Sequence, residues 1–339
     1  MTDIRGGSEK DLGIGIVGTG KISRQFAAAL HLTPGVVARS VYSRKAETGK
    51  LYAKECGVPS STDSWEGFLS DPAIDAVYVA TPNVAHFGQA MDALKAGKHV
   101  LCEKPLTTDT ARFDVLAREA KARGLVLMEG MRILHDPVFS LIKKAVARLG
   151  TVRRAEFIYC QYSSRYDKFK DGIVLNAFDP VLSNAAVMDI GVYPVALAVA
   201  LFGATEVTKA SSTFLYNGFE GAGTATLRYD GFDATLTWSK IADVNAPSVI
   251  AGDFGTVAID RLSGTTRVIS AASDGKTESI PYFPAENNMI YEAADLRDAI
   301  RGELDPEPFL AISRETVLTL DAIRRAAGIK FLSDAQPID

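Results

Sequence analysis

The sequence is poor in the residues that build metal centres and disulfide frameworks. It has only three cysteines and four histidines among 339 residues, and Cys56, Cys102 and Cys160 lie far apart. No pair of histidines has the spacing of metal ligands, so we expect no metal site. Isolated cysteines are typical of buried apolar side chains in a reducing compartment, which predicts a cytoplasmic protein.

Long apolar runs and an excess of positive charge are also missing. No apolar run reaches the length that spans a bilayer, so we expect no membrane segment. Lysine and arginine total 37 against 41 aspartates and glutamates, for a net charge of −4. Such a chain lacks a basic field that would attract nucleic acid or an anionic membrane, and we expect neither as a partner.

The length and composition are those of a two-domain globular protein. Hydrophobic residues make up 47% of the chain and charged residues 23%. With 339 residues, each of two domains can bury a core of its own.

The first part of the chain alternates apolar runs with amphipathic segments. Residues 12–17, 36–42 and 75–80 are short apolar runs, and amphipathic or helix-forming stretches separate them. Alternating strands and helices predict a parallel, doubly wound α/β sheet. We therefore expect an N-terminal Rossmann domain that binds a dinucleotide, over residues 10–131.

A glycine-rich turn follows the first predicted strand. It reads Gly18-Thr19-Gly20-Lys21-Ile22 and opens an amphipathic helix. Glycines in this place let backbone N–H groups approach a pyrophosphate at the helix N-terminus. We predict that these five residues bind the cofactor; the alternative is a purely structural turn.

The second predicted strand ends at Ser43-Arg44-Lys45. In dinucleotide folds this position reads the adenosine ribose, and a carboxylate there favours NAD. A hydroxyl and two cations suit a 2′-phosphate instead, so NADP is favoured and NAD remains an alternative. A solvated helix start is the structural alternative.

Two more turns follow later strands. They are Thr81-Pro82-Asn83, with His86 just beyond, and Glu103-Lys104-Pro105. The carboxyl ends of parallel strands are where open α/β sheets bind ligands. We therefore assign cofactor contacts to Thr81, Pro82, Asn83, His86, Glu103 and Lys104.

These three motifs, in this order, resemble the glucose–fructose oxidoreductase / inositol dehydrogenase / rhizopine-catabolism family (Gfo/Idh/MocA). The resemblance implies an α+β second domain, here residues 132–308, with a large, mostly antiparallel open sheet. It also implies that the last helix, about 309–328, packs back toward the first domain, and that the sheet joins subunits into a homodimer or homotetramer. Successive alternating strands without helices between them independently predict the antiparallel sheet.

Asp189 and Tyr193 lie four residues apart in an otherwise apolar segment. On a helix they would share one face, and Pro194 places the helix start near Asp189. Asp189-x-Gly191-x-Tyr193 resembles the catalytic signature of the family's second domain. The structural alternative is a core tyrosine whose hydroxyl bonds a carbonyl.

Hydride exchange with a nicotinamide requires a proton to move at the same carbon's oxygen. A lysine ammonium within ~4–6 Å of a phenol favours the phenolate and makes it a usable base. We expect Tyr193 to be the acid/base and Lys104 to assist it, while Asp189 binds a substrate hydroxyl or holds the tyrosine. Lys104 as the direct proton donor is the alternative.

Four further side chains are candidates for contact with a substrate: Arg132, Tyr162, Arg165 and Phe178. The predicted function is an NAD(P)-dependent oxidoreductase that acts on a small polyhydroxylated substrate, namely a sugar, a polyol or a cyclic trans-diol. A non-catalytic sensor of nucleotide or sugar with the same fold is the competing class. In a third reading, the cofactor stays bound and cycles between two substrates.

Overall fold

The computed structural model describes residues 10–338, and its first part is a six-stranded parallel sheet of order β3-β2-β1-β4-β5-β6. Its strands are β1 (Leu12–Val17), β2 (Val36–Tyr42), β3 (Ser60–Thr62), β4 (Ala76–Val79), β5 (His99–Glu103) and β6 (Leu127–Gly130). The strand order reverses between β1 and β4. Doubly wound sheets bind their ligands at the carboxyl ends of the strands flanking such a reversal.

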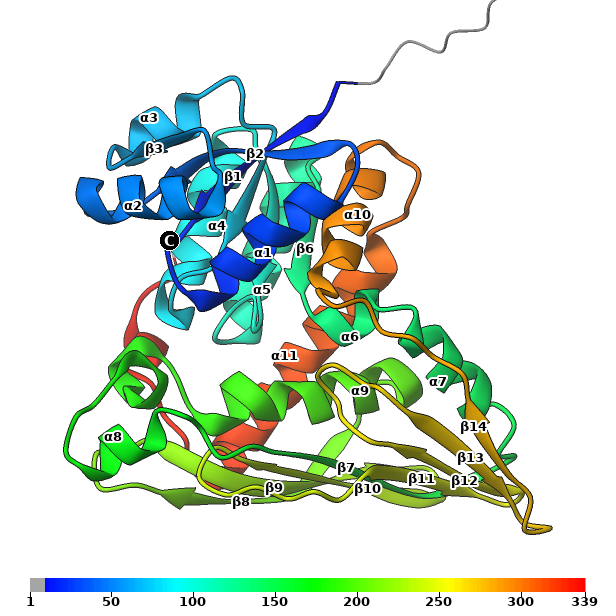
Figure 1. Cartoon of the computed structure of the whole chain (residues 1–339). Coiled ribbons are helices and arrows are strands. Elements are labelled where there is room, and N and C mark those ends of the chain that lie inside the picture. Colours follow the sequence, from blue (N-terminus) through cyan, green and yellow to red (C-terminus); the bar gives the residue numbers. More distant parts are fainter. Residues whose placement is uncertain (1–9, 339) are drawn as a thin grey trace, which may run out of the picture.

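Helices cover both faces of this sheet (Figure 1). One face carries α1 (Lys21–Leu32), α2 (Ala46–Cys56) and α10 (Met289–Ile300), and the other carries α3 (Trp65–Ser70), α4 (Asn83–Lys95) and α5 (Thr110–Arg123). The apolar side chains of each group form a separate core against the strands. The sheet is therefore buried on both sides, as its continuous apolar strands require.

Helix α10 shows that the proposed division of the chain needs a correction. That division placed all of residues 132–308 in the second domain. In the structure, Met289, Ala293 and Leu296 pack with α1 in the core of the first domain. Their spacing puts one apolar stripe on α10, and the face of the Rossmann sheet beside α1 receives it.

The second sheet has eight strands in the order β14-β13-β12-β11-β7-β10-β9-β8. They are β7 (Val152–Cys160), β8 (Glu206–Phe214), β9 (Glu220–Tyr229), β10 (Phe232–Ser239), β11 (Ser248–Gly252), β12 (Gly255–Ile259), β13 (Val268–Ala272) and β14 (Thr277–Ile280). All neighbours are antiparallel except β7 and β10, which run parallel at the centre. The fold class predicted from the sequence, a Rossmann domain followed by an α+β domain with a large, mostly antiparallel sheet, is confirmed.

Among residues 10–338, helices pack on one face of this sheet and none packs on the other (Figure 1). Ala234, Leu236 and Trp238 alternate along β10 and are buried beneath α9 (Val192–Phe202). Thr235 and Thr237, between them, point to the opposite face. The remaining helices of this part are α6 (Arg132–His135), α7 (Val138–Val146) and α8 (Tyr166–Lys170).

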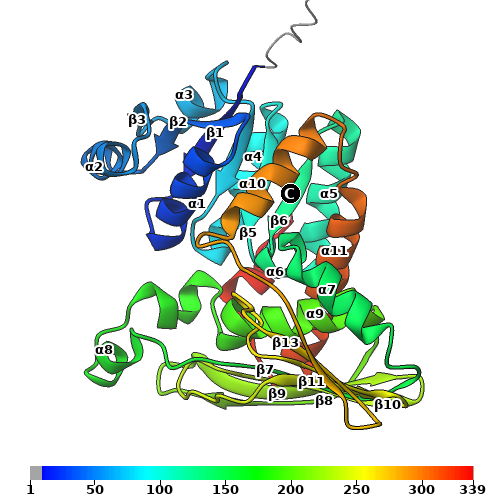
Figure 2. The same cartoon turned by 45° about the vertical axis from the view of Figure 1, so that its right-hand side comes forward.

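The last long helix, α11 (Glu307–Ala327), contacts both parts of the molecule. It packs against α5 and β6 at one end and against α9 and β8 at the other, and Figure 2 shows it running down from beside α5 to the second sheet. Val317 belongs to the core of the first domain, whereas Leu320 and Ile323 belong to that of the second. One helix thus fixes the angle between the two sheets.

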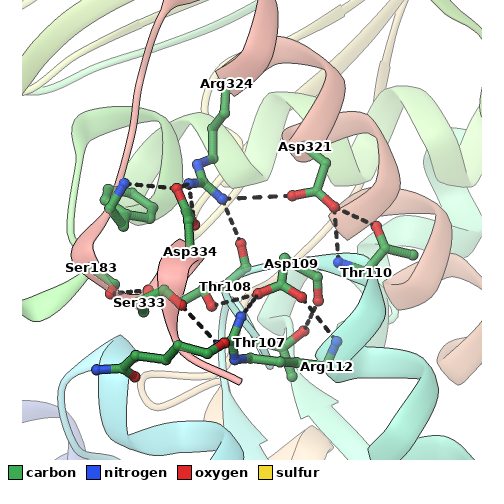
Figure 3. Close-up of polar contacts among 12 residues, drawn as sticks. Thr107, Thr108, Asp109, Thr110, Arg112, Ser183, Asp321, Arg324, Ser333 and Asp334 are labelled. Carbon is green, nitrogen blue, oxygen red and sulfur yellow. Dashed lines mark hydrogen bonds and ion pairs between the residues drawn. The ribbon is translucent and has the colours of Figure 1, made fainter. Parts of the chain in front are cut away.

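After α11 the chain turns back and is held by a polar network (Figure 3). Arg112 on α5 donates to the carbonyls of Ser333 and Gln336, at 2.8 and 2.9 Å. Arg324 on α11 donates to both carboxylate oxygens of Asp334, at 2.8 and 2.6 Å, and to the carbonyl of Thr108. The Ser333 hydroxyl lies 2.7 Å from that of Ser183, just before the segment that carries Asp189.

The structure can be compared with two expectations, the lack of a membrane-spanning helix and the burial of the three cysteines. Within residues 10–338, no helix has both the length and the apolar character needed to cross a bilayer. Cys102 is buried as expected, but Cys56 and Cys160 are partly exposed because they lie at the ends of α2 and β7.

Candidate functional site

A cleft of about 890 Å³ opens at the carboxyl ends of β1, β2 and β4. Eight of the predicted cofactor residues line it: Gly18, Thr19, Gly20, Ser43, Arg44, Lys45, Thr81 and Pro82. The motifs come from three separate turns, which the parallel sheet brings to one edge. The cleft therefore stands where a dinucleotide binds in doubly wound folds.

The glycine turn fits a closely approaching ligand. Gly18 has a φ of +108°, and a Cβ built on it would lie 2.5 Å from the carbonyl oxygen of Ala80. A Cβ on Gly20 would meet nothing within 4 Å, so it would project into the open cleft. The first N–H groups of α1 follow directly, and Gly20 offers no side chain to cap them. Such a cradle of backbone donors suits a pyrophosphate.

Arg44 and Lys45 border the far end of the cleft, where α2 begins. Both side chains are exposed, and Lys45 is the N-cap residue of α2. The Ser43 hydroxyl accepts a hydrogen bond from the Lys45 N–H at 3.4 Å. Two cations and the start of a helix thus face one place, an arrangement that favours a phosphate.

A second cavity, of about 240 Å³, adjoins the cleft and reaches the second domain. The two share Thr81, Pro82, Asn176 and Leu182 in their walls. Asn83, Arg165, Ala177, Asn184 and Asp189 complete the lining of the smaller one. A substrate here would lie beside the end of the cleft that receives a nicotinamide.

Lys104 and Asp189 meet at the boundary between the two domains. Lys104 Nζ donates to Asp189 Oδ1 at 3.0 Å and to the Asp189 carbonyl oxygen at 2.5 Å. The turn after β5 delivers the lysine, and a π-helical turn, Val187–Gly191, delivers the aspartate. The predicted helix start near Asp189 is in fact this wide turn, which leads directly into α9.

A second buried lysine binds the other oxygen of Asp189. Lys240 follows β10, and its Nζ lies 2.7 Å from Asp189 Oδ2 and 2.6 Å from the carbonyl oxygen of Ala177. The Asp189 side chain is still 38% exposed, whereas those of Lys104 and Lys240 are 13% and 4% exposed. The carboxylate is therefore shared between two ammonium groups and still reaches the cavity.

The charges of this group are mutually stabilised. Burial disfavours the charged form of Asp189, but Lys104 and Lys240 hold its pKa well below the ordinary value. Burial also opposes the charge of Lys104, yet the adjacent Asp189 raises its pKa well above the ordinary value. Lys240 is buried more deeply, and desolvation leaves its pKa below the ordinary value despite Asp189. Lys104 is therefore an ammonium at neutral pH.

Tyr193 lies on the first turn of α9, beside Lys104. Lys104 Nζ stands 5.2 Å from the centre of the Tyr193 ring, and the Tyr159 ring packs edge-on against it at 5.3 Å. The tyrosine is 6% exposed. Lys104, Asp189 and Tyr193 are thus brought together from two domains.

Beneath Lys104 lies a buried polar group. The Tyr78 hydroxyl donates to Glu103 Oε1 at 2.7 Å, so these two buried side chains hold each other in place. Both carboxylate oxygens of Glu292 are fully buried without a hydrogen-bond partner among residues 10–338. Arg132 lies nearby and donates to Gln25 Oε1 at 3.1 Å.

Among the predicted contacts that line neither cavity are His86, Phe178 and Tyr162. His86 is buried, with its ring nitrogens 2.9 Å from the Pro105 carbonyl and 2.8 Å from that of Thr81, so it joins the two turns instead of facing a ligand. Phe178 is buried in an aromatic cluster with Phe169 and Phe219. The Tyr162 hydroxyl donates to Asp167 Oδ1 at 2.6 Å.

Other predicted residues have mixed placements, and several lining residues were missed. Lys21 is exposed at the start of α1 and Ile22 packs against the core, and neither lines the cleft. The missed lining residues include Thr48, Gln89 and Asn176. Lys240, which lines neither cavity but binds Asp189, was missed as well. Thr48 and Gln89 lie three residues after the predicted Lys45 and His86, about one helical turn, and could have been found from that spacing. Lys240 carried no such signal.

The fold and the site together define a class of protein. A Rossmann sheet with a glycine-lined cleft, joined to a second domain whose π-helical turn and helix α9 supply a carboxylate and a tyrosine, is the architecture of NAD(P)-dependent oxidoreductases of sugars and polyols. Residues 12–131 match the model of the oxidoreductase family with an NAD-binding Rossmann fold, and residues 139–258 match that of the GFO/IDH/MocA C-terminal domain. The chain belongs to the GFO/IDH/MocA family, as its motifs indicated.

Relatives align over nearly the whole chain. Scyllo-inositol 2-dehydrogenase (NADP(+)) IolU of Bacillus subtilis is 41% identical over 322 residues, which cover 94% of this chain and 98% of the relative. Human trans-1,2-dihydrobenzene-1,2-diol dehydrogenase is 28% identical over 340 residues, with 94% and 98% covered. KijD10, a 3-ketoreductase from Actinomadura kijaniata solved with NADP and TDP-benzene, superposes with a TM-score of 0.81 at 26% identity, with the same coverage.

Proposed function

We propose that this protein is an NADP-dependent oxidoreductase that interconverts a secondary alcohol and a ketone on a polyol, a sugar or a cyclic trans-diol. The observation that carries the proposal is the meeting of Lys104, Asp189 and Tyr193 beside a cavity that continues the cofactor cleft. The named substrates of the relatives, an inositol and a cyclic diol, support this substrate class.

A bound nicotinamide would supply the hydride chemistry. In the oxidative direction, the carbinol carbon would give up its hydrogen as hydride to the bound nicotinamide, the Tyr193 phenolate oxygen would accept the hydroxyl proton, and a C=O bond would form. Lys104 stays charged in this environment, since two Asp189 oxygens hold its protons. This supports Tyr193 as the proton acceptor and Lys104 as the group that stabilises negative charge on the reacting oxygens.

Preference for NADP is inferred from Ser43, Arg44 and Lys45. Their side chains border the adenosine end of the cleft, and the dinucleotide rule places the ribose there. The relatives that name NADP support the same preference. We also infer a cytoplasmic enzyme that assembles as a homodimer or homotetramer through the open face of the second sheet.

The test is reduction of NADP⁺ and NAD⁺ by the purified protein with inositols, aldoses, polyols and cyclic trans-diols. We expect turnover with NADP⁺ on one of these classes and none in Lys104→Met. Tight NADPH binding without turnover in either direction, on every class, would contradict the proposal and favour a sensor. Cofactor that survives exhaustive dialysis and is reduced and reoxidised in place would instead show a bound, cycling cofactor.

A further inference from the structure

Lys240 is a buried charge to which the reaction proposed above gives no role. Its side chain is 4% exposed, and Phe178 and Phe219 place their rings 5.0 and 5.2 Å from Nζ. Taking an ammonium out of water costs several kcal/mol unless its partners compensate. Its polar partners are the Ala177 carbonyl and Asp189 Oδ2.

The contacts of the Asp189 carboxylate with two lysines give the buried charge of Lys240 a role. Lys240 takes Oδ2 from the second domain, whereas Lys104 takes Oδ1 from the first. Rotating the carboxylate about its Cβ–Cγ bond would break both contacts. With Oδ2 fixed by a buried residue, Oδ1 points at Lys104 before any substrate arrives.

We propose that Lys240 is a positioning residue: it holds the Asp189 carboxylate in the rotation at which Oδ1 binds Lys104. The inference rests on the proposed function only for its kinetic consequence. Lys240 itself does not line the cofactor cleft or the smaller cavity, so it acts through Asp189.

The charged groups around Lys240 determine how the electrostatics of the site change when its ammonium is removed. Asp189 and Lys104 face it from the site, Arg165 from the N-terminus of α8, and Glu220 from β9. Glu220 is occupied, since it accepts hydrogen bonds from Trp238 Nε1 and the Val187 N–H, both at 2.8 Å. Removing the ammonium therefore leaves the excess negative charge on Asp189, beside Lys104 and Tyr193.

The first readout is a crystal structure of Lys240→Met. We expect the Asp189 carboxylate to rotate and its Oδ1 contact with Lys104 to lengthen beyond hydrogen-bond distance. An Asp189 in the same rotation, with the contact intact, would overturn the inference. This readout stands even if no substrate is turned over, so failure of the proposed function is recognised separately.

The second readout is kinetic, with Lys144→Met, an exposed lysine on α7, as the control. We expect Lys240→Met to lower kcat about tenfold, to leave NADPH affinity unchanged, and to move the acid limb of turnover upward by about half a pH unit. The loss should disappear in an Asp189→Asn background, because the partner is then gone. The inference would be overturned if Lys240→Met lowered kcat as much in the Asp189→Asn background as in the wild type. It would also be overturned if Lys240→Met alone had the kcat and pH profile of the wild type.

Discussion

Single residues of the site depend on partners from the other domain. Lys104 comes from the Rossmann sheet, and its two acceptors are both on Asp189 of the second domain. Tyr193 is one helical turn further on and lies beside the same ammonium. Substitutions here should therefore affect turnover much more than cofactor binding.

Tyr193→Phe is expected to lower kcat by ~10²–10⁴-fold, the usual contribution of a positioned acid/base. The affinity for NADPH should be unchanged, because Tyr193 does not line the cofactor cleft. Steady-state kinetics and a fluorescence titration measure the two quantities. Tyr216→Phe, at an exposed tyrosine of the second domain, is the control. Near-normal turnover in Tyr193→Phe would contradict this assignment and would identify Lys104 as the group that exchanges the proton.

Arg44→Ala is expected to raise KM for NADP⁺ about 10- to 100-fold and to leave that for NAD⁺ nearly unchanged. The reason is the loss of a charge-assisted hydrogen bond to the 2′-phosphate, worth about 1.5–3 kcal/mol. Lys54→Ala, at an exposed cation on α2, the helix that follows Arg44, is the control. Equal effects on the two cofactors would place the 2′-phosphate elsewhere.

Among the elements, the π-helical turn and the C-terminal segment do the positioning. The turn Val187–Gly191 widens the helix at Asp189, the residue that receives both lysines. The C-terminal segment reaches the same region, because Ser333 bonds Ser183 and the Ser183 carbonyl accepts from Asn83 at 3.1 Å. Ser183 has a φ of +54°, a conformation that such surrounding contacts must hold.

Arg324→Met is expected to lower the free energy of unfolding by about 3 kcal/mol. It leaves the Asp334 carboxylate and the Thr108 carbonyl without their buried donor. Urea unfolding measures the change. Its neighbour Arg325 is exposed, so Arg325→Met should cost less than about 0.5 kcal/mol. If Arg324→Met lowers the free energy of unfolding as little as Arg325→Met does, the network in Figure 3 adds no stability.

For the whole molecule, the buried Glu292 predicts a pH dependence of stability. Burial, reinforced by Glu103, raises the pKa of Glu292 to about 8. Between pH 4.5 and 8 the folded chain therefore holds a proton that the unfolded chain has lost, so this group's contribution to stability falls as pH rises. The slope it adds is at most about 1.4 kcal/mol per pH unit.

Glu292→Gln should flatten that decline, since the amide cannot ionise. The free energy of unfolding, measured in urea at pH 5, 6.5 and 8, is expected to fall less steeply than in the wild type. Glu47→Gln, at an exposed position on α2, should reproduce the wild-type slope. Identical slopes in Glu292→Gln and the wild type would show that Glu292 is ionised in the folded protein.

Thr237→Arg is expected to shift the protein toward monomers. Thr237 lies on the face of β10 opposite the buried Leu236 and Trp238, at the centre of the uncovered side of the second sheet. A charge there would be buried, unpaired, in a sheet-to-sheet contact. Light scattering after size exclusion measures the mass. Thr277→Arg, on the edge strand β14, is the control; a wild-type mass in Thr237→Arg would place the contact elsewhere.

Much of this protein could be derived from local sequence. The apolar runs and the glycine, Thr-Pro-Asn and Glu-Lys-Pro turns determined the Rossmann sheet, because strand burial and turn chemistry are local properties. The strands β3 and β14 carried no apolar run that would predict them, since they are short and mostly polar.

Only the tertiary structure decided how the distant parts meet. That Lys240 would reach Asp189, that α10 would pack with α1, and that His86 and Phe178 would be buried all depend on contacts between segments far apart in the chain. Such contacts leave no periodicity in the sequence. The sequence thus determined which residues could carry the chemistry, and the packing of two sheets around α11 determined which of them share a site.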